Sequence, residues 1–158
     1  LEQCLAKIRE QGRDYTFPEI AAMAAEAGPS EHVFNPDDQS FASPTDMPSA
    51  ISSYMEERGW KAPDTDARLF RLIYDSLAAR YAEVFASLKE IAPFPIETLH
   101  IVGGGSQNDF LNRLTAEACQ VKVVAGPAEG TALGNIMVQA GLSRRDISAS
   151  ITTKTYTI

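Results

Sequence analysis

The sequence predicts an α/β domain that is rich in helix, with a short, mainly parallel sheet flanked by helices. Apolar residues recur at helical spacing over most of the first 91 residues. Beyond residue 97, short apolar runs alternate with amphipathic segments, which is typical of strands joined by helices. The chain of 158 residues is long enough for one domain with a real core and too short for two large ones.

Two short helices are predicted at the beginning of the chain. The first covers residues 1–12 and ends at Gly12, and its apolar face carries Leu1, Leu5 and Ile8. Residues 16–19 read Thr-Phe-Pro-Glu, which is typical of a capping box with proline in the first turn. The alanine-rich helix that follows is expected to stop at Gly28-Pro29.

Residues 29–48 contain four prolines and show little periodicity, so they predict an irregular loop. The loop is expected to be ordered, because apolar residues are available to anchor it. These anchors are Val33, Phe34, Phe41 and Met47.

A helix is predicted from about Pro48 to Arg58, and a much longer one follows. Asp64 or Thr65 is expected to cap the long helix, which runs to about Ile91. Its main apolar stripe consists of Leu69, Ile73, Leu77, Tyr81, Val84 and Leu88, and it is widened by Phe70, Tyr74 and Phe85. A helix with such a wide apolar face is expected to be largely buried against a sheet.

The rest of the chain predicts strands and helices in alternation. Strands are expected at 98–102 and 121–125, and helices at 107–119 and 129–140. The strands lack strong alternation, which favours parallel strands covered on both faces. Residues 151–158 are rich in Thr, Ile and Tyr, which predicts a further strand there.

The first predicted strand runs into three glycines, Gly103, Gly104 and Gly105, and these lead into a helix. This arrangement exposes backbone N–H groups at a helix N-terminus, a surface that suits a phosphate or a nucleotide. Ser106-x-x-Asp109 is similar to a capping box, which leaves the amide of Asn108 available to face a ligand. The alternative is a tight turn that uses its glycines only for backbone conformation.

Two known phosphate-binding motifs do not fit this turn. The dinucleotide fingerprint requires a third glycine where Asn108 stands, and a P-loop requires a Gly-Lys-Ser/Thr sequence that does not follow. The segment 125–135 is a second glycine-rich strand-to-helix connection. Gly134 lies within the predicted helix, so a close backbone or ligand approach is expected there. Glu129 is expected only to interact favourably with the helix dipole.

Composition excludes several classes of function. The net charge of −7 argues against a general nucleic-acid surface, because neutralising phosphates needs clustered Lys and Arg. The adjacent pair Arg144-Arg145 is interpreted as part of a solvated loop. Cys4 and Cys119 are too few for a disulfide framework, which favours a reducing, cytoplasmic setting. No apolar run reaches the roughly 20 residues that a membrane helix requires.

Several motifs together resemble the C-terminal domain of the FGGY carbohydrate kinases, within the actin-like ATPase (ribonuclease H-like) superfamily. They are the segments 73–82, 99–112 and 125–135, together with the loop that begins Asn35-Pro36-Asp37-Asp38. The resemblance covers nearly the whole chain. It implies that residues 1–158 form a C-terminal nucleotide-binding domain and that an N-terminal lobe is absent, its part of the sheet being encoded upstream.

The resemblance also implies a binding site for ATP. Gly104 is the implied backbone contact, flanked by Gly103 and Gly105, and Asn108 occupies the position whose side chain reaches the adenosine. Ser106 is expected to act as a cap rather than as a contact.

The implied reaction transfers the ATP γ-phosphate to the 1-hydroxyl of a ketose, L-rhamnulose, with Mg²⁺ bridging phosphates in the full-length enzyme. No segment resembles the family's catalytic stretch, and Asp75 is expected to satisfy neighbouring backbone or a basic group. The chain alone is therefore expected to be inactive, with no catalytic or metal residue of its own. The alternatives are a kinase for fuculose or xylulose, a non-catalytic actin-like nucleotide-binding module, and an interaction domain with a merely structural turn.

Overall fold

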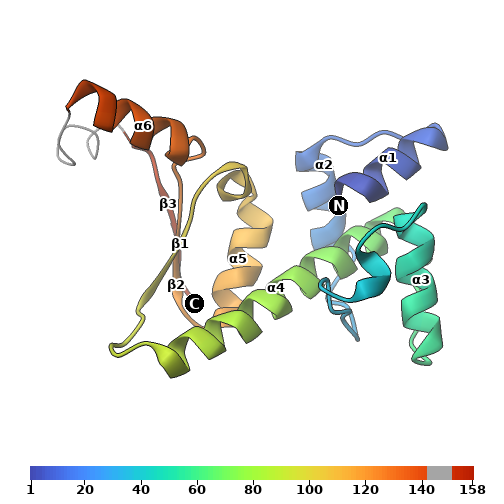
Figure 1. Cartoon of the computed structure of the whole chain (residues 1–158). Coiled ribbons are helices and arrows are strands. Elements are labelled where there is room, and N and C mark those ends of the chain that lie inside the picture. Colours follow the sequence, from blue (N-terminus) through green and yellow to red (C-terminus); the bar gives the residue numbers. More distant parts are fainter. Residues whose placement is uncertain (142–150) are drawn as a thin grey trace. The chain divides into compact units, whose positions relative to one another are not determined.

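The computed structural model describes residues 1–141 and 151–158. The chain divides into two compact units, residues 1–81 and residues 82–158, which we describe separately (Figure 1). The predicted solvated loop at Arg144-Arg145 lies outside the described residues.

The first unit begins with two helices that follow the predicted pattern. Helix α1 spans Glu2–Glu10 and buries Leu5 and Ile8. Helix α2 spans Phe17–Glu26, and the capping box at its start is confirmed. The Thr16 hydroxyl accepts a hydrogen bond from the Glu19 N–H, and the Glu19 carboxylate accepts one from the Thr16 N–H at 2.7 Å.

Residues 29–48 form the predicted irregular loop, interrupted by a short 3-10 helix η1 at Gln39–Phe41. Phe34 and Phe41 anchor it as expected, because both are buried and their ring centroids lie 4.9 Å apart. Val33 is not an anchor, since 37% of its surface is exposed, and Met47 is only half-buried.

Helix α3 spans Met47–Glu57, and Asp46 caps it by accepting a hydrogen bond from the Ser49 N–H at 2.9 Å. Its buried face carries Ile51, Tyr54 and Met55. The Tyr54 ring packs 5.1 Å from the ring of Phe41, measured between centroids. The loop and α3 therefore share one aromatic core.

Helix α4 spans Asp66–Ile91. Of the two predicted caps, Thr65 is the one observed, because its hydroxyl accepts a hydrogen bond from the Arg68 N–H at 3.3 Å. The side chain of Asp64 instead binds the Arg68 guanidinium. Within the first unit, α4 buries Leu69, Phe70, Leu72, Ile73 and Tyr74.

The Asp75 carboxylate confirms the structural role expected for it. The Arg71 Nε lies 2.9 Å from both carboxylate oxygens, and the Ser30 N–H donates to Oδ2 at 2.8 Å. Both side chains of the ion pair are nearly buried. Asp75 thus ties the loop to α4 and satisfies a basic group and a backbone donor.

The predicted burial of the whole α4 stripe is wrong in its second half. Tyr81, Val84 and Leu88 are 40%, 43% and 45% exposed, respectively. In the second unit, the neighbouring helix face packs inward instead, with Phe85 buried and Ala82 beside it. Successive helix positions are about 100° apart, so one face can be buried while the adjacent one stays open.

Among its described residues, the second unit contains a three-stranded sheet in the order β1-β2-β3. Strand β1 (Thr98–Ile101) runs parallel to β2 (Lys122–Ala125), with Thr98 opposite Lys122. Strand β3 (Lys154–Tyr156) confirms the further strand, but it pairs antiparallel to β2. The described sheet is therefore mixed rather than mainly parallel, because β3 adds to β2 in the opposite direction.

Helix α5 (Asp109–Cys119) connects β1 to β2, and helix α6 (Gly130–Ala140) follows β2. The buried core of this unit consists of Phe85, Ala116, Cys119, Val121 and Val123. Burial alternates along β2, with Val123 and Ala125 buried, Val124 half-buried and Lys122 exposed. Coverage of this strand on both faces is thus not observed among the described residues.

Candidate functional site

The turn after β1 is held in place by main-chain bonds to the segment that follows β2. Gly103 has a φ of 82°, a conformation that favours glycine, and its N–H donates to the Pro127 carbonyl at 3.0 Å. The Gly126 N–H in turn donates to the Ile101 carbonyl at 2.8 Å. The two glycine-rich connections found in the sequence are therefore neighbours in the structure.

Gly104 and Gly105 are exposed, and nothing in the described chain requires glycine at either position. A Cβ atom built on either residue would meet nothing within 4 Å, and neither has a positive φ. Their N–H groups have no acceptor among the residues that the structure describes. The turn therefore presents two adjacent amide donors on an open surface, where a ligand can approach the main chain closely.

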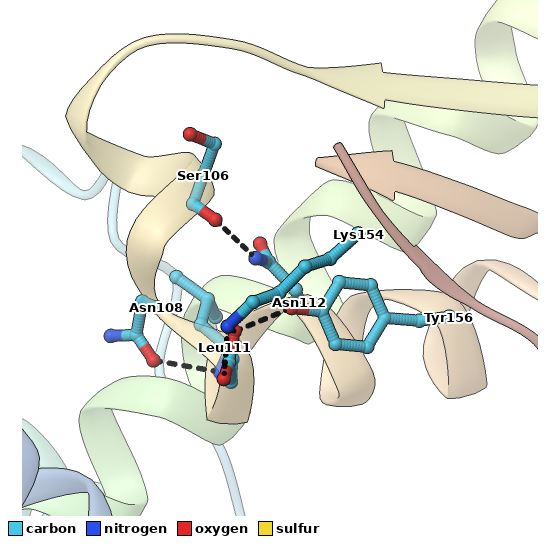
Figure 2. Close-up of polar contacts among 7 residues, drawn as sticks. Ser106, Asn108, Leu111, Asn112, Lys154 and Tyr156 are labelled. Carbon is cyan, nitrogen blue, oxygen red and sulfur yellow. Dashed lines mark hydrogen bonds and ion pairs between the residues drawn. The ribbon is translucent and has the colours of Figure 1, made fainter. Parts of the chain in front are cut away.

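Beneath the turn, two buried polar side chains hold its carbonyl groups. The Ser106 hydroxyl donates to the Gly103 carbonyl at 2.7 Å. Figure 2 shows the second bond, in which Asn112 Nδ2 donates to the Ser106 carbonyl at 3.0 Å. Ser106 is 6% exposed and Asn112 is 1% exposed. The short 3-10 helix η2 at Gly104–Gln107 is thus supported from its inner side.

The cap of α5 differs from the predicted Ser106-x-x-Asp109 box. Asn108 is the N-cap residue, and its Oδ1 accepts a hydrogen bond from the Leu111 N–H at 3.0 Å (Figure 2). Ser106 lies within η2 instead, because the four residues of this tight 3-10 helix precede α5. The expectation that Asn108 reaches adenosine stays a prediction, since its side chain has a capping role in this structure.

The second connection shows why glycine occurs at some of its positions. Gly126 has a φ of 115°, and a Cβ there would lie 2.7 Å from the Thr152 carbonyl oxygen. By contrast, a Cβ on Gly134 in α6 would meet nothing within 4 Å. The close backbone approach predicted at Gly134 is therefore not found among the described residues, and approach of a ligand there stays a prediction. Glu129 is exposed at the start of α6 and makes no side-chain cap.

A polar cluster that sequence analysis missed joins β3 to the start of α5. Lys154 Nζ lies 2.9 and 2.8 Å from the two carboxylate oxygens of Asp109, and the Tyr156 hydroxyl donates to the same carboxylate at 2.6 Å (Figure 2). The only sequence signals were an acidic residue in the first turn of a helix and a Thr- and Tyr-rich terminus. Neither indicates that positions 45 residues apart are partners.

This cluster shifts the titration of its members. The hydrogen bonds from Lys154 and then Tyr156 hold the pKa of Asp109 below its ordinary value. Burial, followed by the bond to Asp109, raises the pKa of the Tyr156 hydroxyl. The carboxylate of Asp109 is therefore ionised and already occupied by a cation beside the turn.

The described residues include no group of three His, Cys, Asp or Glu side chains able to hold a metal ion. Within the same residues, no helix is both long and apolar enough to cross a membrane.

Comparison with known proteins identifies the relatives of the chain. A rhamnulokinase of Bacteroides thetaiotaomicron is 43% identical over 162 residues, which cover 96% of this chain and 33% of that protein. A rhamnulokinase of Ligilactobacillus salivarius is 42% identical over 166 residues, 99% of this chain and 34% of that protein. A third, from Pectobacterium atrosepticum, is 50% identical over 107 residues, 68% of this chain and 22% of that protein. The chain spans about a third of the length of the first two relatives.

Residues 1–142 match the family model described as the FGGY family of carbohydrate kinases, C-terminal domain. This domain has an actin-like ATPase fold, which agrees with the helix-rich α/β architecture predicted from the sequence and observed here. The chain therefore belongs to the C-terminal domain family of the FGGY carbohydrate kinases.

Proposed function

We propose that residues 1–158 serve as the nucleotide-binding domain of an ATP-dependent sugar kinase, and that the turn Gly103–Gly105 binds the phosphates of ATP. The observation that carries this proposal is the pair Gly104 and Gly105. Neither conformation nor packing against described residues requires glycine there, and their N–H groups have no acceptor among those residues. Close approach of a ligand to the main chain explains both facts.

In the proposed reaction, ATP supplies the γ-phosphoryl group, and the work of this domain is binding and orientation. The N–H groups of Gly104 and Gly105 would donate to phosphate oxygens, and the nearby N-terminus of α5 favours negative charge. Asn108, beside the turn, would lie on the adenosine side. Phosphoryl transfer depends mainly on such positioning and on charge stabilisation.

The acceptor that we propose is the 1-hydroxyl of L-rhamnulose, because the relatives named above are rhamnulokinases. A kinase for fuculose or xylulose is the alternative within the family. The sugar pocket, the aspartate that accepts the hydroxyl proton and the ligands of Mg²⁺ are assigned to no residue of this chain. We accordingly expect the 158-residue chain to be inactive without the remaining two thirds that its relatives possess.

The two cysteines support a cytoplasmic setting, because Cys4 and Cys119 are both buried and form no disulfide. The partners we propose are ATP and a small ketose, with no nucleic acid or membrane.

Titration of the ¹⁵N-labelled chain with ATP tests the nucleotide site directly. We expect the amide signals of Gly104 and Gly105 to shift, and Gly104→Val to weaken binding because the side chain occupies the space of the phosphates. Since that side chain points into open space, the unfolding midpoint without nucleotide should stay unchanged. An unaltered ATP affinity in Gly104→Val would remove the turn from the nucleotide site.

A chimera tests the reaction and the substrate. The matching third of the Bacteroides thetaiotaomicron relative is replaced by this chain, and phosphorylation of rhamnulose, fuculose and xylulose is compared. We expect turnover of rhamnulose by the chimera and none by the chain alone. Turnover by the chain alone would contradict the expected inactivity, and an inactive, folded chimera would contradict the assignment as a kinase domain.

A further inference from the structure

We infer that Asn112, acting through Ser106, is a positioning residue for the nucleotide: it fixes the direction in which the Gly104 N–H points. The inference rests on the proposed function, and it concerns residues that lie beneath the turn. Neither side chain reaches the surface on which ATP would lie, because Asn112 is 1% exposed and Ser106 is 6% exposed.

The Gly103 carbonyl accepts two hydrogen bonds, both from Ser106. The Ser106 N–H donates to it at 3.0 Å and the Ser106 hydroxyl at 2.7 Å. In a trans peptide the C=O and the next N–H lie in one plane and point in opposite directions. Holding the Gly103 oxygen inward therefore turns the Gly104 N–H outward, toward the open side of the turn.

Ser106 is itself held in position by Asn112. Its carbonyl accepts the hydrogen bond from Asn112 Nδ2 at 3.0 Å (Figure 2). Asn112 belongs to the second turn of α5, where its own N–H donates to the Asn108 carbonyl at 3.0 Å. The amide of Asn112 thus fastens the 3-10 segment to a regular helix, and through Ser106 it fixes the Gly103–Gly104 peptide.

The choice of asparagine at this buried position supports the inference. Asn112 Oδ1 is buried and has no partner among the described residues. An unsatisfied buried acceptor costs about 1–3 kcal/mol, so an apolar residue of similar size would suit the core better. The donor Nδ2 is what asparagine provides here and leucine does not.

The experiment compares Asn112→Leu and Ser106→Ala with a matched control. Thr115→Val removes a buried hydroxyl of the same helix, which donates to the Leu111 carbonyl at 2.8 Å and has no part in the turn. For each chain, the ATP dissociation constant is measured by NMR titration, and the unfolding midpoint is measured without nucleotide. The amide signals of residues 103–105 are recorded in the same spectra.

We expect Asn112→Leu to weaken ATP binding about tenfold, the effect of roughly 1.4 kcal/mol, and to move the amide signals of the turn. Ser106→Ala should weaken binding in the same direction, and it provides the test if Asn112→Leu does not fold. Thr115→Val should leave affinity and turn signals unchanged. Equal affinities in wild type, Asn112→Leu and Ser106→Ala would overturn the inference alone. Absence of ATP binding by the wild-type chain would overturn the proposed function and the inference with it.

Discussion

The carboxylate of Asp109 binds Lys154 across 45 positions of the chain, with Nζ 2.8 and 2.9 Å from its two oxygens. The contact joins the first turn of α5 to the strand that lies last in the sequence. Lys154 and Asp109 are 62% and 49% exposed, so solvent screens their attraction. The pair therefore contributes little to the free energy of unfolding. Its main effect is to fix the position of β3 against the start of α5.

The first prediction concerns the acid stability of this attachment. The pKa of Asp109 is lower in the folded chain than in the unfolded one, so the unfolded state binds the proton more readily. The stabilisation is thus present above about pH 4, the ordinary value for aspartate, and is lost as the pH falls below it. Asp109→Asn should flatten the acid side of the stability profile, measured by urea unfolding at pH 3 to 7.

The second prediction contrasts two glycines of the second connection. Gly134→Ala should stabilise the chain by about 1 kcal/mol, because glycine is a poor residue in a helix and the added methyl group meets open space. Gly126→Ala should destabilise it by more than about 1 kcal/mol, because φ is 115° and the methyl group would meet the Thr152 carbonyl. Urea unfolding of both variants provides the comparison, and equal effects would contradict it.

The third prediction concerns the thiol of Cys4. Burial raises its pKa to about 11, so the folded state keeps the thiol neutral. Below about pH 8.5 the thiol is neutral in both states, so its ionisation does not reduce the free energy of unfolding. As the pH rises toward 11, that free energy falls, because the thiol ionises readily only in the unfolded chain. Cys4→Ala should reduce the loss of stability between pH 8 and 10. The native thiol should also resist alkylation at pH 8 until urea unfolds the chain.

The fourth prediction tests the buried ion pair of α4. Asp75→Asn should destabilise the first unit by about 3 kcal/mol, because the Arg71 guanidinium loses the carboxylate beside it in a nearly buried site. Asp64→Asn is the matched control, since the Asp64–Arg68 pair has the same i,i+4 spacing and is about half exposed. A loss of stability as large in Asp64→Asn would contradict the importance of burial.

Local signals in the sequence predicted local structure well. The Thr-Phe-Pro-Glu motif predicted the start of α2, and Asp75 was correctly expected to satisfy backbone and a basic group. These features depend on residues within a few positions or on the chemistry of a single side chain.

The predictions that were wrong concern features that tertiary contacts determine. The Ser106 pattern predicted a cap, but the four residues of the 3-10 helix η2 displaced the cap to Asn108. Periodicity alone could not show which of two adjacent apolar faces of α4 would be covered after Ala78. The antiparallel direction of β3 depends on pairings that no local motif encodes. Gly104 and Gly105 were predicted as part of a candidate site. Their difference from Gly103, whose positive φ requires glycine, is visible only in the folded structure.

The two main-chain hydrogen bonds between the connections, from Gly103 to Pro127 and from Gly126 to Ile101, run in opposite directions. Neither loop can be displaced alone without breaking one of them. A ligand that displaces the first connection should therefore also displace the residues leading into α6, so that the proposed binding of nucleotide would move both loops together.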